Sequence, residues 1–367
     1  MNRAASSPPV PAFRHWLAGF AFSVLFAWVV SAVFLNSISP IVWDEQVGLY
    51  VAPPGTVYRH RSEGWASSRT GPHGIKGLPA DVPAGPKVFF WGNSFVDAVS
   101  VDDPDKMAQA FSSLCREHGL GLLGLGLGGG GESAADYSFK MRAFEREVGP
   151  IALHVIVLGS MGEVLPDLER HGHSRFFSTA GGFGLEKWSA VPSAPALRWT
   201  GVLHDLHLAG AYELYVRLRD LHLRLRPGTA RESGAEAPPG DAAGQASPDT
   251  LRQGWEFLLQ SLLCEARAPI LFVHIPAVPR LVRGSVDFSE PDAGLARAFG
   301  EACARQNVGF LDLAGPFTEH FRATGRFTRG FANTPPGQGH LNQDGQRLAA
   351  QAVFRYIRGQ GHALFAR

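Results

Sequence analysis

Ser94 is the first residue whose setting suggests chemistry. It follows the apolar run at residues 87–91 and the turn Gly92-Asn93. A hydroxyl between the carboxyl end of a buried strand and a helix lies where open α/β sheets bind their ligands. A turn with a simple helix cap has the same pattern. Ser94 is therefore a candidate nucleophile whose role depends on its partners.

A histidine near the end of the chain is the partner that a serine nucleophile requires. His340 stands in the segment Gly337-Gln338-Gly339-His340-Leu341-Asn342, just before the last amphipathic stretch. Its imidazole can take the proton of the serine, and a third group must hold the ring. Because the carboxyl-end loops of parallel strands share one edge, Ser94 and His340 can face one crevice. We expect hydroxyl and imidazole to lie within about 3.2 Å, or somewhat further without substrate.

A glycine-rich block offers a competing interpretation. Gly124-x-Gly126-x-x-Gly129 has the spacing of a dinucleotide-binding turn, which also needs an acidic residue about 20 positions further on, after the next strand. Here the next strand ends near Gly159, which is too far along the chain. The paired histidines His171/His173 and His204/His207 lack the cysteine or carboxylate pattern of a metal site. We therefore expect neither a cofactor nor a metal.

The elements that must position these residues alternate along the second part of the chain. Five apolar runs are separated by amphipathic, helix-like segments, and they lie at residues 87–91, 121–127, 151–159, 270–275 and 308–313. Continuous apolar strands alternating with helices predict a mostly parallel sheet of about five strands, covered on both faces. The predicted domain at 87–367 has an insertion at 197–250. That insertion comprises a long helix at 197–226 and a linker at 227–250, whose composition predicts disorder.

The amino terminus predicts a membrane anchor. Residues 16–35 carry no charge, and at about 1.5 Å per residue they span about 30 Å, the thickness of a bilayer core. Arg3 and Arg14 precede this run, whereas Asp44 and Glu45 follow it, so residues 1–15 should remain in the cytoplasm. A spacer and strap at 36–86 would follow. A cleaved signal peptide is the alternative, although its apolar region is usually shorter, about 7–15 residues.

The composition of the chain excludes one class of function and describes its cysteines. The chain has 367 residues, 45% of them hydrophobic, and a formal net charge of +1. Such a balance provides no electrostatic footprint for nucleic acid. The three cysteines, Cys115, Cys264 and Cys303, each stand in an apolar, helix-like setting, which predicts buried thiols.

The order of these blocks resembles the SGNH (GDSL-type) hydrolase superfamily, in particular its membrane-anchored exported members that act on cell-surface polysaccharides. The resemblance covers about residues 59–363 and lies in three blocks: Gly92-Asn93-Ser94-Phe95, the glycine-rich block, and Gly339-His340-Leu341-Asn342-Gln343-Asp344-Gly345. It implies a three-layer, flavodoxin-like sandwich in which the serine attacks an ester carbonyl and the histidine is its base. The oxyanion would be held by the N–H groups of Ser94 and Gly129 and by an asparagine side chain.

Three positions depart from the family pattern. Asn93 replaces an aspartate, and Met161 stands where the oxyanion asparagine is expected, although the hydroxyl of the neighbouring Ser160 can donate. Gln338 occupies the place of the acid that orients the histidine, so we expect Gln338 or a nearby carboxylate to lie against the second imidazole nitrogen. Losing one oxyanion donor costs about 10²–10³ in turnover, and replacing a triad acid costs about 10⁴ in a well-studied protease.

We therefore expect a membrane-anchored serine esterase or O-acyltransferase on the periplasmic side of the cytoplasmic membrane. It would act through Ser94 and His340 on acyl esters of a cell-surface glycan, and a membrane acyl-donor or polysaccharide export protein could be its partner. The alternative, favoured by Met161 and Gln338, is a catalytically inactive scaffold. Such a scaffold would serve as a glycan-binding subunit of a polysaccharide modification or secretion complex.

Overall fold

The five apolar runs form one parallel sheet, as the sequence predicts. The computed structural model describes residues 10–78, 81–166, 174–187, 194–212, 214–215, 218 and 247–360. The strands of the sheet are β5 (Lys87–Gly92), β6 (Leu123–Gly128), β7 (Ile151–Leu158), β10 (Ile270–His274) and β13 (Gly309–Asp312). Their order is β13-β10-β7-β5-β6, and all four neighbouring pairs are parallel. The chain order of the strands reverses between β5 and β7, which is the switch point of a doubly wound sheet.

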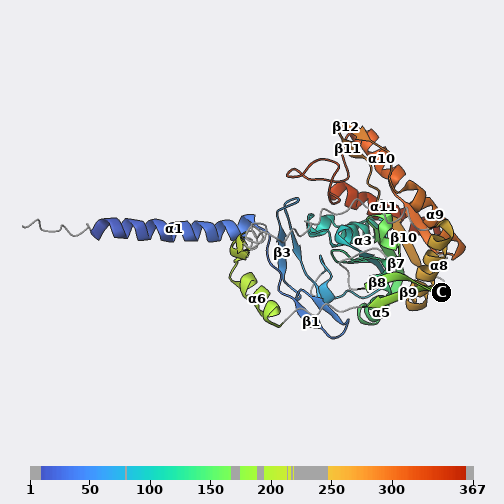
Figure 1. Ribbon diagram of the computed structural model, residues 1–367, viewed down its shortest axis with the longest axis horizontal. Helices are drawn as coiled ribbons and strands as arrows, with labels where there is room; N and C mark the ends of the chain where they lie inside the picture. The colour runs from blue at the N-terminus through green and yellow to red at the C-terminus, as the bar shows by residue number, and fades with distance from the viewer. Residues whose placement is uncertain are drawn as a thin grey trace, which may run out of the picture.

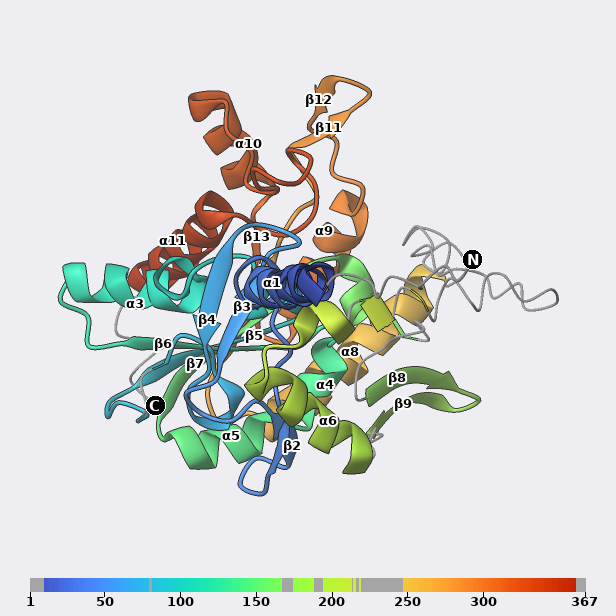
Figure 2. The ribbon, with the colours of Figure 1, turned by 90° about the vertical axis from the view of Figure 1, so that its left-hand side faces the viewer.

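Helices cover both faces of this sheet, which gives the predicted three layers (Figures 1 and 2). On one face Val88 and Phe90 pack against α3 (Met107–Glu117), α10 (Ala314–Thr324) and α11 (Gln343–Gln360). On the other, Phe89 and Trp91 pack in a cluster with α4 (Ala134–Ser138), α5 (Met141–Val148), α8 (Pro248–Glu265) and α9 (Ala293–Arg305). Because side chains alternate along a strand, the uninterrupted apolar run of β5 supplies both cores at once.

The helix-like segments between the strands are divided into shorter elements. Asp103 and Pro104 begin a separate 3-10 turn, η2 (Asp103–Asp105), and α3 starts only at Met107. The helix-like segment between β6 and β7 forms two helices, α4 and α5, which are separated around Phe139. The structure also contains helix α10 and the hairpin β11–β12 (Arg280–Val282 and Ser285–Asp287), which the sequence analysis did not predict.

The strap before the domain contains two hairpins. They pair β1 (Val42–Asp44) with β2 (Leu49–Val51) and β3 (Val57–His60) with β4 (Ala66–Arg69), and the 3-10 turn η1 (Pro72–Gly74) follows. Backbone and side-chain bonds fasten β4 to the domain: Ser67 N–H donates to Asp102 at 2.9 Å and Arg69 N–H to Asp103 at 2.8 Å. The strap is therefore an ordered layer over the domain at this edge.

The insertion differs from the single long helix that was predicted at 197–226. A hairpin of β8 (Ser174–Thr179) and β9 (Gly182–Lys187) precedes α6 (Ala194–Asp205), which stops at a turn over Leu206 and His207. His207 has φ of 55°, a left-handed conformation that no α-helix contains. Of the predicted linker at 227–250, residues up to 246 lie outside the described residues, and 248–250 form the first turn of α8.

The helix α1 (Val10–Phe34) projects from the domain (Figure 1). Its segment Phe13–Phe34 is long and apolar enough to cross a membrane, and almost none of it is buried. An amphipathic helix of a soluble core would bury one side. Helix α1 buries almost none of its surface, which fits a helix whose surroundings are apolar.

Candidate active site

Ser94 lies at the switch point of the sheet. Strand β5 ends at Gly92, and Ser94 is the first residue of the short helix α2 (Ser94–Asp97), with Asn93 as its N-cap. The Asn93 side chain accepts the N–H of Phe95 at 3.0 Å. Because a first-turn N–H has no partner inside its own helix, the N–H of Ser94 is not used within α2. The serine is half-buried at the carboxyl end of the sheet.

His340 is held by a carboxylate that the sequence analysis did not identify. Glu63 accepts the backbone N–H of His340 at 2.7 Å through one oxygen and bonds Nδ1 of the imidazole through the other. Burial opposes the charge of Glu63, but the hydrogen bonds and charge of His340 prevail, and the pKa of this carboxyl lies below its usual range. An ionised Glu63 fixes the proton on Nδ1 and leaves Nε2 as the basic nitrogen.

Gln338 does not have the orienting role that was predicted for it. Gln338 is exposed, and the group that bonds Nδ1 of His340 is the carboxylate of Glu63. Glu63 comes from the turn between β3 and β4, 277 residues before His340 in the chain. No local spacing links the two residues, so only the folding of the strap over the sheet edge brings them together. Gly339 makes room for Glu63, because a Cβ there would lie 2.2 Å from its Oε1.

Phe95 joins the histidine to the nucleophile's helix. Its ring centroid lies 5.7 Å from that of His340, and the guanidinium of Arg329 lies 4.6 Å from the same ring. Arg329 is buried and donates to the carbonyls of Pro276 and Gly339. The imidazole therefore lies beside the residue that follows Ser94.

The predicted hydrogen bond between Ser94 and His340 is not formed in the described part of the structure. No hydrogen bond joins the two side chains there, although both residues lie near the carboxyl edge of the sheet. In serine and cysteine hydrolases, such bonds are often long in the free enzyme and shorten when substrate binds. The arrangement brings the two groups into one region without completing the dyad.

Gly129 also departs from its predicted role. Its N–H donates to Gly92 at 3.2 Å, which extends the parallel ladder of β5 and β6 by one residue. That bond takes the hydrogen that was expected to face the oxyanion. A side chain at position 129 would instead crowd Glu132, because an added Cβ would lie 2.6 Å from its Oε1. Glu132 forms a buried ion pair with Lys140.

The loop after β7 links Ser160 to the nucleophile's turn. Glu163 Oε1 accepts the N–H of Ser160 at 3.2 Å and the side-chain amide of Asn93 at 2.7 Å. Ser160 in turn accepts the Glu163 N–H as a capping box of the 3-10 turn η3 (Met161–Val164), which leaves the proton of its hydroxyl as a donor. Met161 is fully buried in the core, so this position contributes no oxyanion donor.

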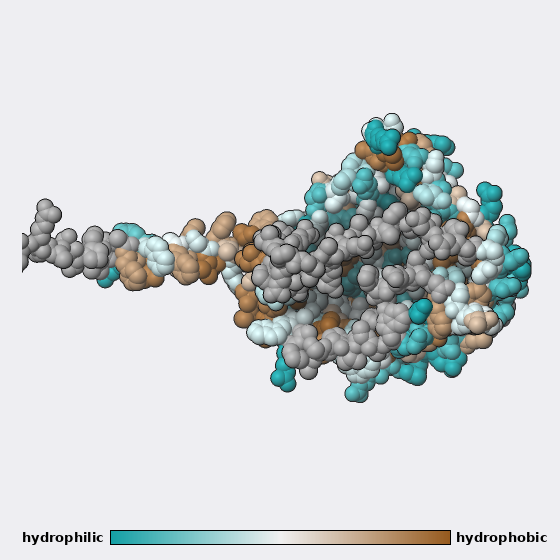
Figure 3. Space-filling model, viewed as in Figure 1, coloured by the Kyte–Doolittle hydropathy of each residue, from teal (hydrophilic) through white to brown (hydrophobic). Residues whose placement is uncertain are grey.

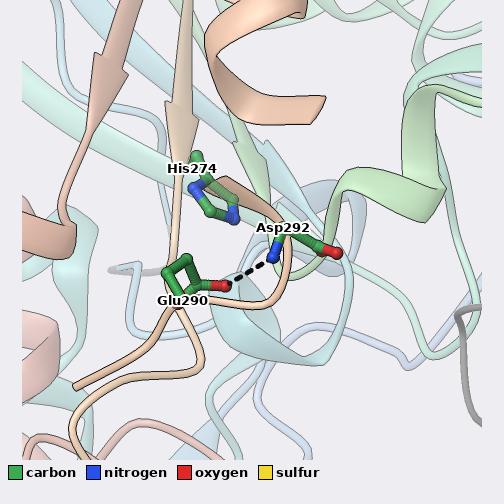
Figure 4. A group of neighbouring side chains, drawn as sticks. All are labelled: His274, Glu290 and Asp292. Atoms are coloured by element: carbon green, nitrogen blue, oxygen red, sulfur yellow. Dashed lines mark hydrogen bonds between the residues drawn. The ribbon is translucent and has the colours of Figure 1, made fainter. Parts of the chain in front are cut away.

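A second polar group lies behind this loop, at the end of β10. His274, Glu290 and Asp292 each offer one atom of the kind that binds metals, and these atoms lie within 4.8 Å of one another (Figure 4). The carboxylates already accept backbone N–H groups, Glu290 from Ala277 at 2.8 Å and Asp292 from Met161 at 3.0 Å. Through these hydrogen bonds the two carboxylates hold together the loops that follow β7 and β10.

Comparisons with known proteins give only distant similarities. No family model matches the chain, and no curated protein matches its sequence. Among solved structures it is similar to TesA, with 13% identity, a TM-score of 0.38, and coverage of 74% of this chain and 98% of that one. It is also similar to an acetyl xylan esterase, AlAXEase, with 13% identity, a TM-score of 0.37 and coverage of 74% and 99%.

A third similar structure is a mutant of Axe2, an acetylxylan esterase from Geobacillus stearothermophilus. It shares 13% identity with a TM-score of 0.36 and coverage of 75% of this chain and 94% of that one. Values this low assign no activity to the chain. The case for a reaction at this edge of the sheet therefore depends on the contacts of Ser94, His340 and Glu63 themselves.

Proposed function

We propose that the protein is a serine esterase or O-acyltransferase, anchored to the membrane by α1, that acts on acyl esters of a cell-surface glycan. The observation that carries this proposal is the Glu63–His340 pair beside α2, which begins with Ser94. A serine that only begins a helix needs no oriented histidine nearby, whereas a serine nucleophile does. The pair supplies the acid that the sequence motif lacks.

In the proposed reaction, Ser94 Oγ attacks the ester carbonyl while Nε2 of His340 accepts its proton. Glu63 stabilises the resulting imidazolium through Nδ1 and does not itself take up the proton. The N–H of Ser94 and the hydroxyl of Ser160 are the candidate donors to the oxyanion. The imidazolium then protonates the leaving alkoxide, and water or a sugar hydroxyl releases the acyl group from Ser94 in the reverse sequence.

A covalent probe tests the proposal most directly. A fluorophosphonate applied to the purified full chain in detergent should label the wild type, because it reacts only with an activated serine. Labelling should be lost in Ser94→Ala and strongly reduced in His340→Ala. Ser100→Ala is a matched control, since this nearby buried serine belongs to no proposed step. Equal labelling of wild type and Ser94→Ala would refute the esterase proposal.

The alternative of an inactive, glycan-binding scaffold is favoured by two observations. Within the described residues, Ser94 and His340 share no hydrogen bond, and the N–H of Gly129 is already bonded to Gly92. A scaffold would show no probe labelling and no hydrolysis of p-nitrophenyl acetate above the Ser94→Ala background. It would still bind acylated polysaccharide, and Ser94→Ala would leave that binding unchanged.

A further inference from the structure

The insertion presents apolar side chains to solvent beside the base of α1. Trp199 and Val202 on α6, Leu206 in the following turn, and Tyr212 and Tyr215 beyond it are each between 44% and 63% exposed. We call these five residues the α6 surface. A step of three places Trp199 and Val202 on one side of α6, and Leu206 follows four residues after Val202, in the turn. Large apolar side chains gathered in this way usually have a partner.

The turn after α6 is fastened to the end of α1 by hydrogen bonds. Trp28 Nε1 donates to the carbonyl of Leu206 at 2.9 Å, and Ser31 Oγ donates to that of His207 at 2.9 Å. The N–H of Gly210 donates to Ser31 Oγ at 2.7 Å. These bonds join segments that are 176 to 179 residues apart in the chain. The α6 surface therefore has a fixed place relative to α1.

The position of these contacts along α1 shows how far they lie from the end of its apolar segment. Trp28 lies six residues before Phe34, where α1 ends, which is about 9 Å back along the helix. The turn thus lies at the level of the apolar segment rather than beyond it. Unpaired carbonyls are costly at that depth, and Trp28 and Ser31 satisfy those of Leu206 and His207. Gly210 permits the close approach, since a Cβ there would lie 3.0 Å from Leu35.

We propose that the α6 surface is a second membrane contact, which lies in the boundary between lipid headgroups and acyl chains where α1 emerges. The proposal rests on the proposed role of α1 as the membrane anchor. Tryptophan and tyrosine concentrate at this boundary because each ring has an apolar body and a polar tip. Figures 1 and 2 show the chain that follows α6 against the base of α1, with α6 leading away from it, and Figure 3 shows apolar side chains continuing from α1 onto the domain.

A depth measurement in reconstituted membranes tests this proposal. The full chain, with its exposed Cys264 replaced by serine, receives a single cysteine at Leu206 or Val202 and an environment-sensitive NBD label. It is reconstituted into phosphatidylcholine vesicles with or without nitroxide-labelled acyl chains, which quench NBD only where the label is in contact with lipid. Phe26→Cys in α1 reports the anchor itself, and Val282→Cys on the β11–β12 hairpin, also exposed, is the control away from the membrane.

The expected result is quenching at 206, 202 and 26 and none at 282. Quenching at 26 alone would overturn the second contact while leaving the anchor intact. Quenching at 206 and 202 without 26 would refute the anchor, and with it a second contact at the place where α1 emerges. A blue-shifted but unquenched label at 206 would show that protein, such as a second copy of the chain, covers the α6 surface, and would overturn the proposal.

Discussion

At the scale of single residues, the site depends on a carboxylate that reaches His340 from a distant part of the chain. Gln338, next but one to the histidine, could only have accepted the imidazole N–H without stabilising a positive charge. Glu63 can do both, and the lowered pKa of its carboxyl keeps it ionised at neutral pH. A histidine oriented by an ion rather than an amide is a stronger base for Ser94, because the imidazolium is stabilised as it forms.

Replacing Glu63 should therefore reduce catalysis much more than replacing Gln338. We expect Glu63→Gln to lower kcat for p-nitrophenyl acetate by up to about 10⁴, the loss seen when an amide replaces the acid of a protease triad. Glu63→Asp should recover part of the activity, and Gln338→Ala should leave it unchanged. Steady-state kinetics with thermal melts of each variant would check this. Equal effects at 63 and 338 would contradict the assignment.

Lys106 provides a residue-scale prediction about stability. Burial lowers the pKa of this amine from 10.5 to about 8, although Asp97 and Asp103 partly oppose the shift. Between these two values the unfolded chain holds the proton that the folded chain has lost, so stability rises with pH there. The rise amounts to about 3 kcal/mol when complete.

The measurement compares denaturant unfolding of wild type and Lys106→Met from pH 7 to pH 10.5. The comparison is needed because burial raises the thiol pKa values of Cys115 to about 11 and Cys303 to about 12, which lowers stability over part of the same range. The contributions of the two thiols are the same in wild type and Lys106→Met, so they cancel in the difference. The wild type should gain stability relative to Lys106→Met as pH rises, and a constant difference would show that Lys106 does not titrate in this range.

At the scale of elements, local patterns predicted the sheet and missed what depends on distant contacts. All five strands and the placement of Ser94 after the first of them follow from apolar runs and turn residues. The break after α6 could not be predicted, because it depends on Trp28 and Ser31, which lie in another helix. Glu63 was missed for the same reason, and Cys264 is exposed although its neighbours predicted burial.

The packing of α2 on β6 gives a prediction about glycines. A Cβ at Gly128 would lie 2.3 Å from the backbone nitrogen of Asp97 and 2.4 Å from the carbonyl oxygen of Asn93. Backbone atoms cannot give way as a flexible side chain does, so Gly128→Ala should push α2 away and move Ser94. We expect lower probe labelling and a lower melting temperature. Gly130→Ala, where nothing lies within 4 Å of the added carbon, should change neither.

At the scale of the whole molecule, the strap connects the end of α1 to the candidate active site. Arg61 donates to the carbonyl of Val33 at 3.3 Å, and Asn36 donates to Ser62 at 3.1 Å. Glu63, the next residue, holds His340. If α1 spans the membrane, the candidate site lies close to the bilayer surface, where a membrane-bound acyl donor or a nascent surface glycan would be within reach. The strap thus fixes the position of the site relative to α1, and it supplies Glu63, the acid that the sequence motif around His340 lacks.

The side of the membrane on which the domain lies can be tested with a native cysteine. Arg3 and Arg14 precede the uncharged run at residues 16–35, and Asp44 and Glu45 follow it, so we expect residues from Tyr50 onward to face the periplasm. Cys264 is exposed, whereas Cys115 and Cys303 are buried, with thiol pKa values that burial raises. A membrane-impermeant maleimide added to intact spheroplasts should therefore label the wild type at Cys264. Cys264→Ser should remain unlabelled. Labelling only after lysis would place the domain in the cytoplasm, where a glycan of the cell surface cannot be its substrate.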